Sequence, residues 1–164
     1  MSTTATLRAP GEVEALPKVS ISERLRTDPA YQAFMLLRIA FTVAPILFGL
    51  DKFFNVMVDW EQYLAPWIND LSPLSATHTM YAVGVIEIVA GLAVAIKPRY
   101  AAYIVAAWLA GIIVNLLTLD PPRYYDIAAR DFALMLAAIT LNRLATAFGA
   151  TTVVEETRHL RAAA

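Results

Sequence analysis

The sequence predicts an all-α integral membrane protein, a bundle of four transmembrane helices with a short interfacial helix in the first outer loop. Of the 164 residues, 59% are hydrophobic and 16% are charged, whereas soluble domains carry about 25% charged residues. Four apolar runs, at 31–50, 77–96, 100–119 and 126–148, also stand out. Each holds about twenty residues, enough for a helix to cross a hydrocarbon core of roughly 30 Å.

The segments outside the four-span membrane domain at 31–148 are polar. In the N-terminal segment 1–30, Pro10, Gly11 and Pro17 are expected to break any early helix. Ser20 and Glu23 then form the pattern of a capping box, which predicts a short surface helix. The C-terminal tail, 149–164, is short and mixed in charge.

The first run carries its polar and small residues on one side. Arg38, Thr42, Pro45, Gly49 and Lys52 are separated by steps of four, three, four and three, which places them along one helical face. We expect this face to point into the bundle and Pro45 to kink the helix. Arg38 has a second interpretation, because its long side chain could instead extend to the nearer membrane surface.

The first loop, at 51–76, is too polar to cross a membrane. It predicts one helix over 60–68, which lies in the headgroup region and ends near Pro66 or Pro73. An aromatic lid over a ligand is the alternative. Both interpretations depend on five side chains at helical spacing, which are Trp60, Tyr63, Leu64, Trp67 and Ile68.

The second run contains one ionisable group between its ends, Glu87, close to its centre. A carboxylate at this depth is costly if it faces lipid, so it should point into protein and find a partner. Gly84 and Gly91 lie one turn to either side on the same face. Because small residues let two backbones approach, this face is expected to pack closely on another helix.

The third and fourth runs add further polar groups. The turn at 97–99 is short enough for only a tight hairpin between the second and third spans. Trp108, Gly111 and Asn115 share one face of the third run, and Arg130 and Asp131 lie near the start of the fourth. A proline-stiffened loop at 120–125 joins these two runs.

The distribution of basic residues predicts the orientation. Ten of the thirteen Lys and Arg residues lie in 1–38, 97–99 and 143–164, and three lie in or beside the two opposite loops. The positive-inside rule therefore predicts that both termini are cytoplasmic and that the first and third loops face outward. For a bacterial cell this indicates a multi-pass protein of the inner membrane.

Composition also excludes several classes of function. The chain has no cysteine, which excludes disulfides, thiol catalysis and Cys-ligated clusters. Two histidines far apart in the sequence argue against a bis-His haem, and no metal site is expected. A net charge of −1 without a basic run gives no footprint for nucleic acid. No intrinsic cofactor is expected, and a bound quinone or lipid is the candidate ligand.

The predicted topology gathers charged groups from several helices in the outer half of the bundle. The first pairing we expect is Glu87 with Lys52 or Arg130, because a buried carboxylate needs a basic partner. The candidates for ligand binding or proton relay are Glu87, Lys52, Arg130, Asp131, Asn115 and Arg38. The candidates for the rim of the site are His78, Tyr124, Tyr125 and Trp60.

Two interpretations of this cluster remain open. In the functional one, Glu87 binds or relays a proton while Lys52 or Arg130 holds an anion or a carbonyl oxygen. In the structural one, the charges compensate each other and fix the register of the helices. The rim residues are likewise typical of anchors at the membrane interface.

Three short patterns resemble the DoxX-like family of small four-helix bacterial membrane proteins, over residues 31–148. They are Gly49-x-x-Lys52, Gly84-x-x-Glu87-x-x-x-Gly91 and the polar start of the fourth span. Arg38, Lys52 and Glu87 match the polar positions characteristic of that family. The resemblance implies a protein of the bacterial cell membrane, whose founding relatives are tied to a thiosulfate:quinone oxidoreductase and others to redox-stress complexes.

Two functions follow as hypotheses, and neither establishes that the chain is itself an enzyme. The first is a redox-linked membrane subunit whose outward-facing polar pocket binds a quinone or a small sulfur species, with the electron carrier supplied by a partner. The alternative is a non-catalytic accessory subunit of a larger respiratory or photosynthetic complex. Expected partners are the lipid bilayer and other membrane subunits or further copies of the chain. A small transporter is a weaker third hypothesis.

Overall fold

The protein is an all-helical bundle in its computed structural model, which describes residues 20–71, 73–119 and 123–162, with side chains up to Phe148. Pro10, Gly11, Pro17 and the first half of the proline-stiffened loop, residues 120–122, lie outside the described residues. The helices are α1 (Ile21–Thr27), α2 (Pro29–Asp51), η1 (Trp60–Tyr63), α3 (Pro66–Leu71), α4 (Ala76–Ile96), α5 (Pro98–Leu117) and α6 (Tyr125–Ala162).

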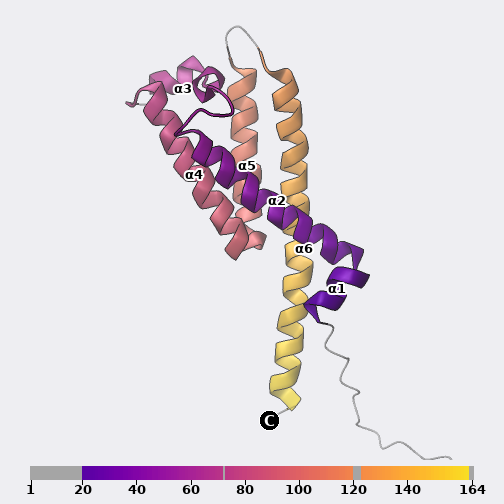
Figure 1. The fold of residues 1–164 in the computed structure, drawn as a ribbon. Helices are drawn as coiled ribbons and strands as arrows, with labels where there is room; N and C mark the ends of the chain where they lie inside the picture. Colours follow the sequence, from indigo (N-terminus) through magenta and orange to yellow (C-terminus); the bar gives the residue numbers. More distant parts are fainter. Residues whose placement is uncertain (1–19, 72, 120–122, 163–164) are drawn as a thin grey trace, which may run out of the picture.

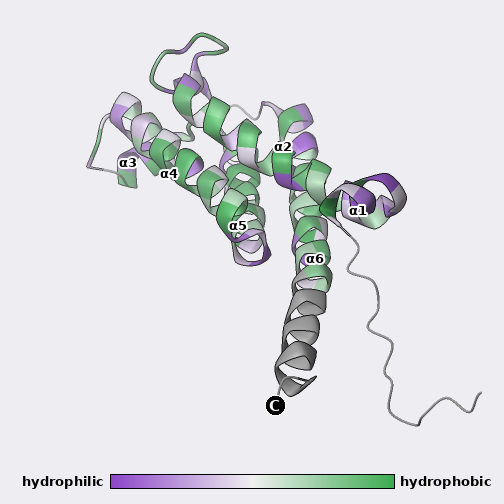
Figure 2. Cartoon of the chain, turned by 60° about the horizontal axis from the view of Figure 1, so that its bottom comes forward, coloured by the Kyte–Doolittle hydropathy of each residue, from purple (hydrophilic) through white to green (hydrophobic). Residues whose placement is uncertain are grey.

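Four of these helices are long and apolar enough to cross a membrane, which confirms the predicted fold class. They are α2, α4, α5 and the part of α6 from Tyr125 to Phe148, and each begins and ends within two residues of the expected run. Hydrophobic residues predominate along the visible parts of α2 and α4 (Figure 2). Large exposed side chains such as Leu36, Ile104 and Leu136 therefore face lipid, where exposure carries no hydrophobic penalty.

The short helix before the first span is also confirmed. The Ser20 side chain accepts a hydrogen bond from the backbone N–H of Glu23 and so caps α1. Asp28 then caps α2 by accepting from the N–H groups of Ala30 and Tyr31.

The bundle consists of two closely packed pairs, α2 with α4 and α5 with α6, and contact between the pairs is less extensive. α2 is inclined to α5 and α6 and crosses them from one end of the bundle to the other (Figure 1). The turn at 97–99 and α1 lie towards one end, and residues 52–75 lie at the other. We call these the α1 end and the cap end.

Glycines allow the close packing of α2 on α4. A Cβ placed on Gly49 would lie 2.6 Å from the carbonyl oxygen of Gly84, and one on Gly84 would lie 2.6 Å from that of Gly49. Further along, a Cβ on Gly91 would lie 2.7 Å from the carbonyl oxygen of Thr42. The polar and small face of the first span therefore packs on the glycine face of the second. The sequence predicts that both faces are buried in the bundle, and the structure shows that they meet. Gly111 differs, because its Cβ position has no neighbour within 4 Å.

The prediction of one continuous helix over 60–68 is wrong, because the segment forms two short helices. η1 ends at Tyr63 and α3 begins at Pro66, with Leu64 in an extended conformation between them. A proline disfavours helical geometry in the residue before it and has no N–H to continue a helix. Pro66 therefore starts a second short helix, and the two pieces lie across the cap end of the bundle (Figure 1).

Candidate functional site

A cavity of about 690 Å³ lies between the two helix pairs, towards the cap end. All four spans and the loop after α2 contribute to its walls. Most of the lining is apolar, with polar side chains gathered at one part of it. Such a combination of volume and lining is typical of sites for small organic ligands.

The central polar feature is an ion pair between α2 and α4. The Lys52 Nζ lies 2.6 Å from a Glu87 carboxylate oxygen, and the side chains are only 4% and 13% exposed. Gly49 and Gly84 bring the two helices together one turn away, which sets the separation of the two charges. The pairing expected first from the sequence is therefore present, and both residues line the cavity.

Trp60 covers the lysine from the cap side. The Lys52 Nζ lies 3.7 Å from the centre of the Trp60 ring, a cation–π contact that stabilises the buried charge. The indole N–H donates to Asp51 at 2.8 Å. Asp51 also accepts from the backbone N–H groups of Val56 and Met57, so one buried carboxylate fixes both the loop and the tryptophan.

Asn115 on α5 holds the next part of the loop. Its side-chain oxygen accepts from the Ala65 N–H at 2.8 Å, and its amide nitrogen donates to the Tyr63 carbonyl at 2.6 Å. Tyr63 itself lines the cavity. Burial raises the pKa of the Tyr63 phenol, so this hydroxyl stays protonated and able to donate a hydrogen bond.

Trp108 on α5 brings a polar group that has no partner among the described residues. Its side chain lies beside the Glu87 carboxylate, but its buried Nε1–H has no acceptor at hydrogen-bonding geometry. A buried donor without a well-aligned acceptor lowers the stability of the fold. A ligand oxygen in the cavity would remove this cost.

Arg130 and Asp131 reach the cavity from α6. The Arg130 Nε lies 3.4 Å from an Asp131 oxygen; the arginine side chain is 64% exposed and the aspartate is buried. With Lys52 and Glu87, they bring two positive and two negative groups to the cavity wall. The formal charges of these four groups cancel.

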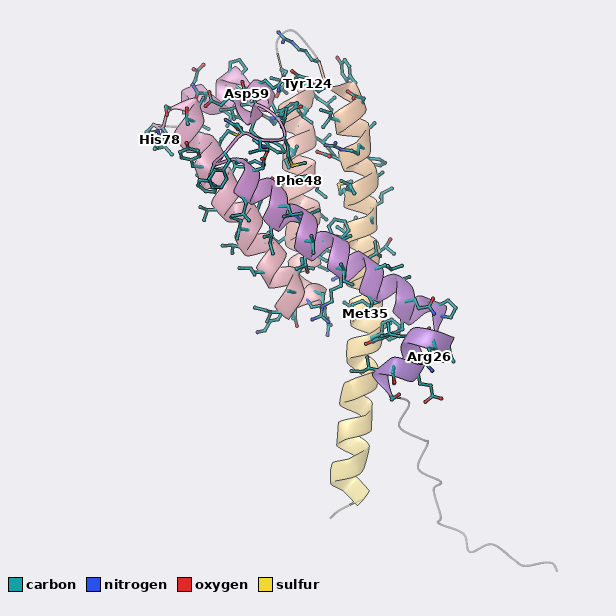
Figure 3. All side chains as sticks on the ribbon, viewed as in Figure 1. Arg26, Met35, Phe48, Asp59, His78 and Tyr124 are labelled. Atoms are coloured by element: carbon teal, nitrogen blue, oxygen red, sulfur yellow. The ribbon has the colours of Figure 1, made fainter. Side chains whose placement is uncertain are left out.

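The structure places the remaining predicted residues away from the cavity lining. Arg38 lies towards the α1 end and donates to the carbonyl of Ala95 on α4, so it faces the bundle. His78 is exposed and bonded to the Ser75 hydroxyl. The Tyr124 hydroxyl donates to Gln62, which ties the cap to the start of α6, and Tyr125 is exposed. Tyr124 and His78 both lie at the cap end (Figure 3).

Three residues that shape the site were not among the predicted candidates. Trp108 shares a helical face with Asn115, and this spacing correctly predicts that the two residues lie on the same side of α5. The spacing does not indicate that the indole N–H lacks a partner. Asp51 precedes Lys52, and Tyr63 belongs to the aromatic series of the loop. Their contributions depend on the course of the loop, which no short pattern in the sequence specifies.

These features define a class, the multi-pass α-helical membrane proteins, here with a partly charged cavity between the helices. Residues 33–117, slightly more than half of the chain, match the DoxX family. The chain belongs to the DoxX family, as the glycine and charge patterns of its first two spans indicate. No curated protein and no solved structure shows a significant match to it.

Proposed function

We propose that the protein is a redox-linked membrane subunit that binds a quinone or a small sulfur species in the cavity. The observation that carries the proposal is the buried Lys52–Glu87 ion pair facing the cavity beside the unpaired Trp108 N–H. Following the distribution of Lys and Arg, we place the cap end on the outer side of a bacterial inner membrane, with both termini in the cytoplasm.

A quinone suits the chemistry of these walls. Its two carbonyl oxygens are acceptors, and the Trp108 N–H and the Lys52 ammonium are donors that line the same cavity. Its ring is flat and apolar, like the neighbouring surfaces of Trp60 and Tyr63. A volume of about 690 Å³ lies within the range of roughly 300–1,000 Å³ typical of sites for organic ligands.

The ion pair gives this site a means to move protons. Conversion of a quinone to a quinol takes two electrons and two protons, and the reverse reaction releases them. Glu87 is a carboxylate placed to accept or return a proton, while Lys52 compensates its charge. The electrons are exchanged with a partner subunit or a cofactor that such a partner carries.

A small sulfur species would use the same donors but fits less well. The four charged groups at the wall cancel, so an anion such as thiosulfate meets no surplus positive charge. It would also leave most of the cavity unfilled. We therefore favour the quinone within this proposal.

The test is a titration of the protein in lipid nanodiscs with decylubiquinone and, in parallel, with thiosulfate. Trp60 and Trp108 line the cavity, so quenching of intrinsic fluorescence reports binding. We expect saturable quenching by decylubiquinone, weakened about tenfold or more in Glu87→Gln, because this variant loses the carboxylate that positions the Lys52 ammonium and compensates its charge. His78→Ala, outside the cavity, is the matched control and should bind like the unaltered protein. Saturable binding of neither compound would refute the proposal.

The second candidate function is that of a non-catalytic accessory subunit, and Gly111 favours it. Gly111 is exposed within the third span, and no described residue lies within 4 Å of its Cβ position. A helix of another subunit can approach closely at such a position. If this face holds a partner, Gly111→Leu should abolish its co-purification from native membranes in mild detergent while ligand binding persists.

A further inference from the structure

We infer that the ligand enters the cavity sideways from the lipid, through a slot between α2 and α6, and that it is a neutral membrane-dissolved amphiphile. This inference rests on the proposed function and narrows its ligand class. It selects a molecule with a flat polar head and an apolar chain over a water-soluble sulfur anion. Three observations support it: the closed cap, the position of the exposed lining residues and the splayed arrangement of α2 and α6.

The cap, residues 56–71, is tied to all four sides of the bundle. Its backbone and Trp60 bond to Asp51 at the end of α2, and Glu61 accepts from Thr77 on α4 at 2.6 Å. Asn115 on α5 holds it through two hydrogen bonds. Gln62 accepts from Tyr124, next to the start of α6. Because these bonds must break together to lift the cap, direct entry from water is obstructed.

Among the described residues, the exposed part of the cavity wall lies on α2, on α6 and at Met57, the second residue of the cap. Lining residues of α4 and α5 are all buried or half-buried in the described structure. The exposed ones form the slot rim, which consists of Ala40 and Phe48 on α2, Met57, and Arg130 and Leu134 on α6. The cavity therefore opens between α2 and α6.

The inclination of α2 explains why the slot exists at this end. At the α1 end α2 contacts α6 through aromatic rings: Tyr31 and Phe34 lie 5.2 and 5.5 Å from Phe148, centre to centre. Phe41 packs in the same core with Ala138 and Leu141 of α6. Towards the cap end α2 instead follows α4, so the cavity separates it from α6. Met35 and Phe48 mark these two parts of α2 (Figure 3).

The side chains of the slot rim indicate which kind of solute can enter the cavity. Phe48 and Leu134 are 38% and 40% exposed within helices that span the membrane, so they face acyl chains. Four of the five rim residues are apolar. A solute dissolved in the bilayer meets this opening, whereas a hydrated anion would have to leave water and cross hydrocarbon to reach it. Arg130 at the rim offers a donor to the polar head of an entering amphiphile.

The first experiment needs no ligand. In a Trp60→Phe/Trp67→Phe background Trp108 is the single tryptophan, and phospholipids with brominated acyl chains quench a tryptophan that they can contact. We expect quenching of Trp108 in nanodiscs, lost on filling the slot with Ala40→Phe/Leu134→Phe. The matched control, Ile39→Phe/Leu136→Phe, changes exposed residues of the same helices that do not line the cavity. No quenching of Trp108, or equal quenching in both variants, would overturn the inference. Leu134→Phe alone replaces the double variant if that one does not purify as a single species.

The second experiment follows the rates of decylubiquinone binding by stopped-flow fluorescence. A blocked route slows entry and exit alike, so Ala40→Phe/Leu134→Phe should lower both the association and the dissociation rate constant about fivefold or more. Thr77→Val/Tyr124→Phe, which removes two ties of the cap, should change neither rate. Faster binding in this cap variant, with normal rates in the slot variant, would show entry through the cap. If decylubiquinone does not bind at all, the proposed function is refuted. The quenching of Trp108 by brominated lipid would still show whether the cavity is open to the bilayer between α2 and α6.

Discussion

The polar groups at the two ends of the bundle are satisfied in different ways. At the α1 end, Arg38 donates to the carbonyl of Ala95 and Asn142 donates to that of Arg99. At the cavity, Lys52 and Glu87 pair side chain to side chain, and the neighbouring Trp108 N–H has no acceptor among the described residues. The first arrangement uses backbone carbonyl groups as acceptors, and the second leaves capacity for a ligand. The charge of a residue and its depth in the membrane are therefore not enough to tell a packing role, as for Arg38, from a ligand-binding role, as proposed for Glu87.

The contact between Arg38 and Ala95 has a specific structural cause. Ala95 lies in the last turn of α4, where carbonyl groups have no partner within their own helix. Arg38 supplies one from α2, so the match of this arginine to a characteristic family position is explained here by helix packing.

Substitutions of Glu87 should have the largest effect on stability and ligand binding, and they test whether the cavity differs in role from the α1 end. Glu87→Leu leaves the buried Lys52 without a counter-charge and should destabilise the bundle by about 3–5 kcal/mol. Glu87→Gln retains an acceptor and should keep most of the stability while losing ligand affinity. Thermal unfolding in detergent measures both. Replacing both partners, as Lys52→Met/Glu87→Leu, should restore stability without restoring binding; equal loss in the single and double variants would contradict the assignment.

A smaller effect is expected where the glycines set the geometry of the pair. Gly84→Ala places a methyl group against the Gly49 carbonyl at 2.6 Å and should cost about 1–3 kcal/mol by forcing α2 and α4 apart. Because the same shift moves Lys52 relative to Glu87, ligand affinity should fall with it. Gly111→Ala, with open space at the same position, is the control and should leave unfolding and binding unchanged.

The smallest effect on stability is expected for a substitution at the α1 end, which tests the other side of the comparison. Asn142 is buried, and Asn142→Leu removes its hydrogen bond to Arg99 at a cost of about 1 kcal/mol. Decylubiquinone affinity should not change, because Asn142 does not line the cavity. A fall in affinity as large as that of Glu87→Gln would mean that the two ends do not differ in role.

The sequence was sufficient to predict the spans and the first contact of the site. Helical periodicity and length locate α2, α4, α5 and the spanning part of α6. The glycines flanking Glu87 indicate which face packs, and burial and charge then predict a pairing with Lys52 or Arg130. The structure selects Lys52.

The cap could not be predicted in the same way. Its path depends on Asp51, on Asn115 and on a break at Pro66, which are contacts between distant residues and a local backbone effect within an aromatic series. The cavity itself depends on the inclination of α2, which no periodic pattern reports. For the same reason the unpaired N–H of Trp108 was not foreseen.

The contact between Gly49 and Gly84 has a consequence for how the chain can vary through evolution. Each glycine accommodates the other's carbonyl oxygen, so a side chain at either position meets backbone, which no substitution at the opposite position can shorten. Most packed pairs can drift through compensating changes, with one residue growing as the other shrinks. This pair has no such route, since both members are already the smallest residue. Relatives that keep the same crossing of these two helices should therefore carry glycine at both positions, whatever ligand they bind.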